Sequence, residues 1–181
     1  MATVTFGMRM SLDGFVADAS GDSSPLYPDL DKISENEVVA EAIEATGAIV
    51  MGRGSYDLAE GDFSGYEFQT PIFVVTHEAP KRPAKGENDR LSFTFVSDGV
   101  ESAVEQAKAA AKDKSVQVIG APVGQQCLAA GLIDEISVGV MPVLLGAGIP
   151  MFGGLEKPPK LERIRTLETP ADTELRFRVV K

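Results

Sequence analysis

Two short apolar segments, each followed at once by glycine and the start of a helix, constrain the fold of this chain most strongly. Residues 48–51 lead into Gly52, and residues 116–119 lead into Gly120. Short apolar runs bounded by turn residues are typical of strands buried in parallel sheets. Strands that alternate with helices are joined by right-handed crossovers, so the pattern predicts an α/β fold with a mainly parallel sheet.

The periodicity of the other segments extends this prediction along the chain. Ser34 to Glu37 form a capping box, which predicts a helix reaching about Ala45. Residues 19–31 are rich in turn residues and predict a surface loop. Further strands are predicted at 4–10, 72–76, 136–140 and 175–179, and further helices at 100–112 and 121–130. The late strands have no helix between them, so we expect an antiparallel edge at the C-terminus.

Length and composition favour one globular domain over residues 1–181, since no linker or repeat divides the chain. No run of about 18 apolar residues occurs, and the N-terminus lacks the pattern of a signal peptide, so we expect no membrane association. Cys127 is the only cysteine, which excludes an internal disulfide and fits a cytoplasmic protein. Its place in a predicted helix among apolar residues favours core packing.

The net charge of −10 disfavours nucleic acid as a partner, because a strongly acidic chain repels phosphates. An anionic ligand would therefore need local positive charge and backbone N–H donors.

Gly52, Arg53, Gly54 and Ser55 offer such donors, because they stand where a buried strand passes into a helix. Free N–H groups at a helix N-terminus bind anions, and glycine lets the backbone approach a phosphate closely. The planar guanidinium of Arg53 suits a phosphate, and Ser55 adds a hydroxyl. The alternative interpretation is a tight strand–helix turn with a solvated arginine, and the residues alone leave both open.

Gly120 opens a second turn of the same layout, followed by Ala121, Pro122, Val123 and Gly124. A capped helix with proline in its first turn would explain this segment without a ligand. Two adjacent turns of this kind, however, could hold the two parts of a dinucleotide.

His77, the only histidine, follows Thr76 at the end of the predicted strand 72–76. No second set of metal ligands accompanies it, so we expect no metal site. Beside Arg53 it could instead help to hold a phosphate. Carboxylates are abundant, and one of them could be a buried acid with a raised pKa, but the sequence does not single out a catalytic residue.

At these residues the chain resembles the dihydrofolate reductase superfamily. More closely, it resembles single-domain proteins related to the reductase half of the bifunctional riboflavin-biosynthesis deaminase–reductase. The matching motifs occur in the family's order at 11–17, 51–56, 74–77, 118–120, 128–135 and 142–152. The resemblance implies a three-layer α/β fold, with a twisted, mixed and mostly parallel sheet, helices on both faces and an antiparallel C-terminal edge.

The resemblance also implies that NADPH lies across the strand ends. By position, Arg53 should meet the adenosine 2′-phosphate, and Gly54 and Ser55 the pyrophosphate. Thr76 and His77 should flank the adenosine. The remaining cofactor contacts implied by the family are Val16 and Ala17 at the nicotinamide, with Gly52, Ile119, Gly120, Ala121, Pro122, Val123 and Gly124 around the pyrophosphate.

Two departures from the family's pattern affect these expectations. Dihydrofolate reductases end the strand before the second turn in two glycines, often joined by a cis peptide, whereas this chain has Gly120-Ala121 and then Pro122, which lacks an N–H. Asp29 stands in a segment similar to that of the folate-binding acid, but it lies too far before Met51 for us to assign it a catalytic role.

The function implied is an NADPH-dependent reductase that transfers hydride to a C=N or C=O of a small heterocyclic substrate. The nearest family activity is that of 5-amino-6-(5-phosphoribosylamino)uracil reductase. Dihydrofolate reductase activity is one alternative, and a non-catalytic NADPH-binding or regulatory module is another. A buried carboxylate within reach of the nicotinamide would favour the enzyme. Apolar residues between Leu144 and Phe152 indicate a homodimer, and the resemblance implies the same, because related reductases are often dimers.

Overall fold

A computed structural model of the protein describes residues 2–28 and 36–181. Its centre is an eight-stranded sheet in the order β5-β4-β3-β6-β1-β7-β10-β9. The strands are β1 (Val4–Ser11), β3 (Thr46–Gly52), β4 (Ile72–Val75), β5 (Phe93–Val96), β6 (Ser115–Ile119), β7 (Glu135–Met141), β9 (Lys160–Glu168) and β10 (Thr173–Val180). A separate short pair joins β2 (Phe15–Ala17) to β8 (Ile149–Pro150).

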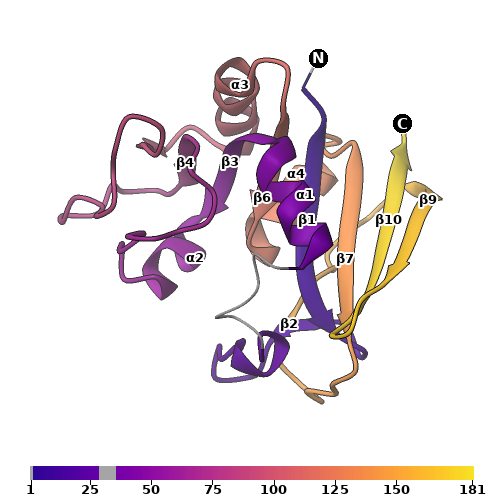
Figure 1. The fold of residues 1–181 in the computed structure, drawn as a ribbon. Helices are drawn as coiled ribbons and strands as arrows, with labels where there is room; N and C mark the ends of the chain where they lie inside the picture. The colour runs from indigo at the N-terminus through magenta and orange to yellow at the C-terminus, as the bar shows by residue number, and fades with distance from the viewer. Residues whose placement is uncertain (1, 29–35) are drawn as a thin grey trace.

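The strands from β5 to β7 pair in parallel, and β10 and β9 add two antiparallel pairings at the C-terminal edge. The parallel strands β3 and β4 are mostly buried apolar runs, as expected where helices cover both faces, whereas β6 alternates buried valines with partly exposed Ser115, Gln117 and Ile119. The mainly parallel sheet and its antiparallel edge confirm the predicted fold class (Figure 1).

Helices lie on both faces of the sheet. On one face pack α3 (Val100–Ala111) and α4 (Ala121–Ala129), which contact β3 and β6. On the other face lie α1 (Glu37–Ala45) and α2 (Arg53–Leu58), and α1 crosses in front of β1 and β6 in Figure 1. A 3-10 turn, Ser24–Leu26, follows β2. The two faces carry different cores: α3 and α4 cover the larger apolar cluster, whereas α2 packs on a smaller aromatic one that includes Tyr56 and Phe63.

Side chains of β1 point alternately to the two faces of the sheet, and those on the face under α1 include polar and charged residues. Even-numbered residues of β1, such as Val4 and Phe6, point to the α3–α4 core and are fully buried. The odd-numbered residues Thr5 and Arg9 point to the α1 side. The face under α1 is therefore polar at the centre of an otherwise apolar sheet.

Three expectations need correction. Helix α1 begins at Glu37, and its cap is Asn36, whose side chain accepts from the amides of Val38 and Val39; the predicted cap Ser34 lies outside the described residues. The predicted loop contains the 3-10 turn at 24–26, while its residues 29–31 are not described. Strands β2, β5, β8 and β9 were not expected at their residues. Strand β9 in particular is an exposed edge strand, so it lacks the apolar alternation that marks a half-buried strand.

No helix in the described ranges is long and apolar enough to cross a membrane.

Candidate functional site

The two glycine turns lie side by side, because β3 and β6 are neighbours in the sheet. Gly120 has φ +102°, a conformation that favours glycine, and an ideal Cβ built on it would lie 2.7 Å from Ser55 Oγ. A Cβ on Gly52 would lie 3.6 Å from the side chain of Val123. The fold thus brings Gly52, Ser55, Gly120 and Val123 together where the turns meet, with Gly120 buried and Gly52 half-buried.

Arg53 connects this pair of turns to the end of β4. Its Nη1 donates to the carbonyl of Glu78 at 2.8 Å and to Thr76 Oγ1 at 3.3 Å, and its Nε donates to Asp57 at 2.7 Å. The side chain is 37% exposed, and its Nη2 makes no hydrogen bond to any described residue. His77, next to Thr76, is exposed. Arg53 therefore contacts Thr76 at the end of β4, and His77 is the next residue along the chain.

The residues after Gly120 are mostly turned inward. Ala121, Val123 and Gly124 are buried, and a Cβ on Gly124 would overlap the ring of Phe6, so packing of α4 on β1 by itself accounts for that glycine. Pro122 is exposed. No cis peptide bond occurs among the described residues, so the bond after Gly120 is trans. Gly54 is exposed, with no atom within 4 Å of an ideal Cβ.

Val16 and Ala17 lie on β2, beyond the carboxyl end of β1, and both are buried. Hydrogen bonds of the described residues do not connect them to the two glycine turns. The turn before β2 is fixed by Asp13, which accepts from Ser11 Oγ and from the amides of Leu145 and Gly146. These hydrogen bonds, that from Ser11 foremost, hold the pKa of Asp13 below its ordinary value.

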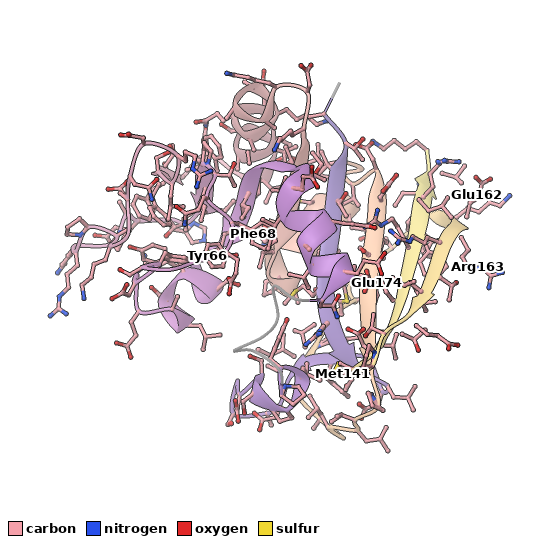
Figure 2. The ribbon with its side chains drawn as sticks, in the orientation of Figure 1. Tyr66, Phe68, Met141, Glu162, Arg163 and Glu174 are labelled. Atoms are coloured by element: carbon pink, nitrogen blue, oxygen red, sulfur yellow. The ribbon has the colours of Figure 1, made fainter. Side chains whose placement is uncertain are left out.

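A cavity of about 560 Å³ lies between α1 and the polar face of the sheet. Its lining runs along β1, β6, β7 and β10, and includes Ile119, the residue directly before Gly120. Apolar side chains of α1, among them Val39 and Ala42, form one wall, and Tyr66 and Phe68 contribute another. In Figure 2, Tyr66 and Phe68 lie on one side of α1, whereas Glu174 lies on the other, against β10.

Glu174 is a buried acid on the floor of this cavity. The strand register places it beside Gly139, which in turn lies beside Arg9, close to the carboxyl ends of β1 and β7. The hydroxyl of Ser137 donates to its carboxylate. A Cβ on Gly139 would lie 2.8 Å from Asp172 Oδ2 and 3.2 Å from Glu174 Oε2, so only glycine leaves room for these charged groups.

Burial raises the pKa of Glu174 above its ordinary value, and the nearby Asp172 carboxylate raises it further. The hydrogen bond from Ser137 and the charges of Arg176 and Arg9 act in the opposite direction but are outweighed. A raised pKa favours the protonated form of a carboxyl group, which is the form that a general acid requires.

The two arginines of the cavity differ in their surroundings. Arg9 donates from Nε to Asp172 at 3.0 Å and lies over the ring of Tyr27, with its guanidinium carbon 5.5 Å from the ring centroid. Arg176 is next to Glu174 along the strand direction, and its Nε is buried without a hydrogen-bond partner among the described residues. Because an unpaired buried donor is unfavourable, this Nε is a candidate contact for a ligand.

Sequence reasoning missed Arg9, Ser137, Glu174 and Arg176. The available signal was the charged residue at alternate positions of strands that are otherwise apolar, as in residues 173–180. Cys127 is buried in α4, as predicted. The described residues contain no group of three or more potential metal ligands, and Asp29 lies outside them.

Comparisons with known proteins agree with this architecture. No curated protein matches the sequence. Among solved structures, a protein of Shewanella sp. PV-4 described as a riboflavin biosynthesis protein aligns over 100% of both chains, with 24% identity and a TM-score of 0.81. A diaminohydroxyphosphoribosylaminopyrimidine deaminase/5-amino-6-(5-phosphoribosylamino)uracil reductase of Thermotoga maritima aligns over 99% of this chain and 57% of its own, with 17% identity and a TM-score of 0.69.

Dihydrofolate reductase of Enterococcus faecalis, solved with NADP(H), aligns over 99% of this chain and 97% of its own, with 14% identity and a TM-score of 0.63. At these identities the likeness concerns the fold, which is that of dihydrofolate reductase. The sequence itself matches the RibD C-terminal domain over residues 2–175. This protein therefore belongs to the RibD C-terminal domain family.

Proposed function

We propose that this protein is an NADPH-dependent reductase that transfers hydride to a C=N or C=O carbon of a small heterocycle. The proposed reaction type is that of riboflavin biosynthesis, since the Shewanella relative is described as a riboflavin biosynthesis protein and the Thermotoga relative as a deaminase/5-amino-6-(5-phosphoribosylamino)uracil reductase. One observation carries the proposal: the cavity that holds the buried acid Glu174 reaches Ile119, directly before the glycine turn at Gly120.

The residues at the strand ends fit a dinucleotide. The half-buried backbone of Gly52 and the hydroxyl of Ser55 would meet the pyrophosphate, and the absence of a side chain at Gly120 leaves room for Ser55 Oγ. Arg53 offers its Nη2 to a 2′-phosphate, which is the group that distinguishes NADPH from NADH. When bound, NADPH would supply the hydride.

The residues of the cavity would orient the heterocycle and supply the proton. The apolar wall of α1 and the rings of Tyr66 and Phe68 suit a flat ring and exclude water from it. Glu174 would hold a proton and deliver it to the nitrogen or oxygen of the reduced double bond, assisted by the hydrogen bond from Ser137.

The first experiment is a fluorescence titration of the protein with NADPH and with NADH. We expect NADPH to bind more tightly, and Arg53→Ala to lose this preference. Arg163→Ala is the matched control, because Arg163 is exposed on the outer strand β9, away from the site (Figure 2). If neither cofactor binds to the wild-type protein, the proposal is wrong.

A turnover assay separates the reductase from its alternatives. Each of three compounds is added to the protein with NADPH: 5-amino-6-(5-phosphoribosylamino)uracil, its dephosphorylated form and dihydrofolate. Oxidation of NADPH is measured as the loss of its nicotinamide absorbance. Reduction of dihydrofolate alone would favour the dihydrofolate reductase alternative. Cofactor binding without reduction of any of the three compounds would favour a non-catalytic module. In the reductase, Glu174→Gln should lower kcat more than it weakens cofactor binding.

We also propose that the protein acts as a homodimer. Leu144, Ile149 and Phe152 are exposed after β7, at 70%, 40% and 37%, and Leu161 and Ile164 are exposed on the edge strand β9. Exposed apolar residues in groups favour an interface with another chain. Analytical ultracentrifugation should give twice the chain mass, and Leu144→Asp or Ile164→Asp should yield monomers; a wild-type monomer would contradict the proposal.

A further inference from the structure

The charges that line the cavity bear on which substrate it accepts, an inference that rests on the proposed reductase function. Among the described lining residues are five carboxylates and two guanidinium groups. The carboxylates belong to Glu41, Glu67, Glu135, Asp172 and Glu174, and the guanidinium groups to Arg9 and Arg176. Even when Glu174 holds a proton, negative charge exceeds positive charge in the lining.

Neither arginine is placed to receive a phosphate. Arg9 forms a buried ion pair with Asp172, with side-chain exposures of 7% and 5%, so its charge is already balanced. Arg176 lies among acids, and its charge lowers the pKa of both Glu41 and Glu174. A phosphate dianion near these groups would face several carboxylates at once, which is unfavourable in a partly enclosed site.

Arg165, which contacts α1 from β9, is also committed to a carboxylate. Arg165 on β9 donates through both of its terminal nitrogens to the carboxylate of Glu41. A phosphate could recruit Arg165 only by breaking this bidentate pair. Two of the lining carboxylates, Asp172 and Glu41, are thus paired with arginines, and the described lining residues keep an excess of acid.

The polar groups that remain available match an uncharged heterocycle. Glu174 can accept from, or donate to, a ring N–H or nitrogen, and the unpartnered Nε of Arg176 can donate to a neighbouring carbonyl. The amide of Gln117, which also lines the floor, adds a donor and an acceptor. The apolar and aromatic walls suit the faces of the ring.

We propose that the substrate of this cavity is an amino-substituted, carbonyl-bearing heterocycle that carries no phosphate, bound with its N–H edge at Glu174 and its carbonyl at Arg176 Nε. A dephosphorylated aminopyrimidine belongs to this class, and its phosphorylated form does not. The reaction that precedes this one would then be a phosphate hydrolysis, or a synthesis that never adds the phosphate.

Calorimetric titration with two matched ligands tests the proposal. The ligands are 5-amino-6-(5-phosphoribosylamino)uracil and the same compound after treatment with a phosphatase. We expect the dephosphorylated compound to bind about tenfold or more tightly than the phosphorylated one, with a difference that shrinks as salt rises. Equal binding, tighter binding of the phosphorylated compound, or failure of both compounds to bind would overturn the proposal.

Two double variants test whether the carboxylates of the cavity cause the difference in affinity between the two ligands. The double variant Glu67→Gln/Glu135→Gln removes two lining charges without touching Glu174, and it should bring the two affinities several-fold closer. The control Glu156→Gln/Glu168→Gln removes two exposed charges outside the lining and should leave the ratio unchanged. A ratio that changes equally in both variants would contradict the assignment, because it would reflect net charge alone.

A second pair of variants tests the hydrogen bond from Arg176. Arg176→Met should weaken binding of the dephosphorylated ligand at least several-fold, whereas Arg178→Met should not. Arg178 is on the same strand but is exposed and outside the cavity. Circular dichroism of both variants checks that they fold, and a folded Arg176→Met variant with unchanged affinity would remove the arginine from the proposal.

The outcomes separate this inference from the proposed function. If NADPH binds and hydride passes preferentially to the phosphorylated compound, the protein is a reductase and the inference about phosphate is wrong. If the dephosphorylated compound binds selectively but NADPH does not bind, the cavity has the proposed selectivity and the reductase function is wrong.

Discussion

Arg9 Nε donates to Asp172 Oδ2 across 3.0 Å, although 163 positions separate the two residues in the chain. The ion pair joins β1, in the middle of the sheet, to the turn before β10. Asp172 is held in place by Thr169, whose hydroxyl donates to its other carboxylate oxygen. Both residues line the cavity between α1 and the sheet.

Removal of one member of this pair should destabilise the protein strongly. Arg9→Met leaves Asp172 buried without its partner, so we expect the free energy of unfolding to fall by about 3–5 kcal/mol. Urea unfolding followed by circular dichroism measures the change. Lys181→Met is the control, because Lys181 pairs with Asp134 at 2.7 Å on the surface and its loss should cost less than about 1 kcal/mol. A similar decrease in the free energy of unfolding in both variants would contradict the prediction, because it would mean that the Arg9 ion pair contributes no more than a surface pair.

The raised pKa of Glu174 predicts a specific pH dependence of stability. Between its ordinary value of 4.5 and its raised value in the folded protein, the folded state binds more protons than the unfolded chain. The contribution of Glu174 to the free energy of unfolding should therefore decrease as pH rises through that window.

Glu174→Gln should abolish this dependence. The stability of the wild-type protein relative to the variant should fall from about pH 4.5 upward, as measured by urea unfolding at a series of pH values. Glu168→Gln, at an exposed position of β9, should show no such trend. A wild-type protein that gains stability over Glu174→Gln with rising pH would mean that the carboxyl is ionised when buried.

Gly120→Ala should test the contact between the two glycine turns. The positive φ and the closeness of Ser55 Oγ both oppose a side chain here, and we expect a loss of about 1–3 kcal/mol in the free energy of unfolding. Gly131→Ala is the control, because Gly131 also has positive φ, +70°, but has open space around it. The Gly120 variant should be the less stable of the two by thermal unfolding, and should bind NADPH more weakly.

Cys127 should be unreactive in the folded protein. It is fully buried, and burial raises the pKa of its thiol to about 12, so very little thiolate forms at neutral pH. A disulfide reagent that absorbs on reaction should label no thiol in buffer and one thiol per chain in urea. Rapid labelling in buffer would mean that α4 opens readily from the sheet.

Much of the fold was predictable, because local patterns are strong where strands are buried. The apolar runs at 48–51 and 116–119 and the alternation at 4–10 gave strands close to their observed bounds. The two glycine turns were also predictable, because in each a glycine directly follows the residues that indicate a strand. Strand β9 could not, because an edge strand with both faces near solvent has no apolar period to detect.

The acid of the cavity could not be identified in advance. Glu174 and Glu162 look alike in sequence, since each stands among charged and apolar residues near the C-terminus. In the structure, Glu162 is exposed on the outer strand, whereas Glu174 is buried under α1 (Figure 2). Burial depends on which element covers the strand, and periodicity carries no information about that.

The sequence by itself determined the helices, the six strands β1, β3, β4, β6, β7 and β10, the two glycine turns and the position of Arg53. Each of these follows from the properties of neighbouring residues. Only the tertiary structure decided that Arg9, Ser137, Glu174 and Arg176 meet in one cavity. Their meeting requires the pairing of β1 with β7 and of β7 with β10, which joins distant parts of the chain. Helix α1 lies over this polar face, and burial is the main cause of the raised pKa of Glu174.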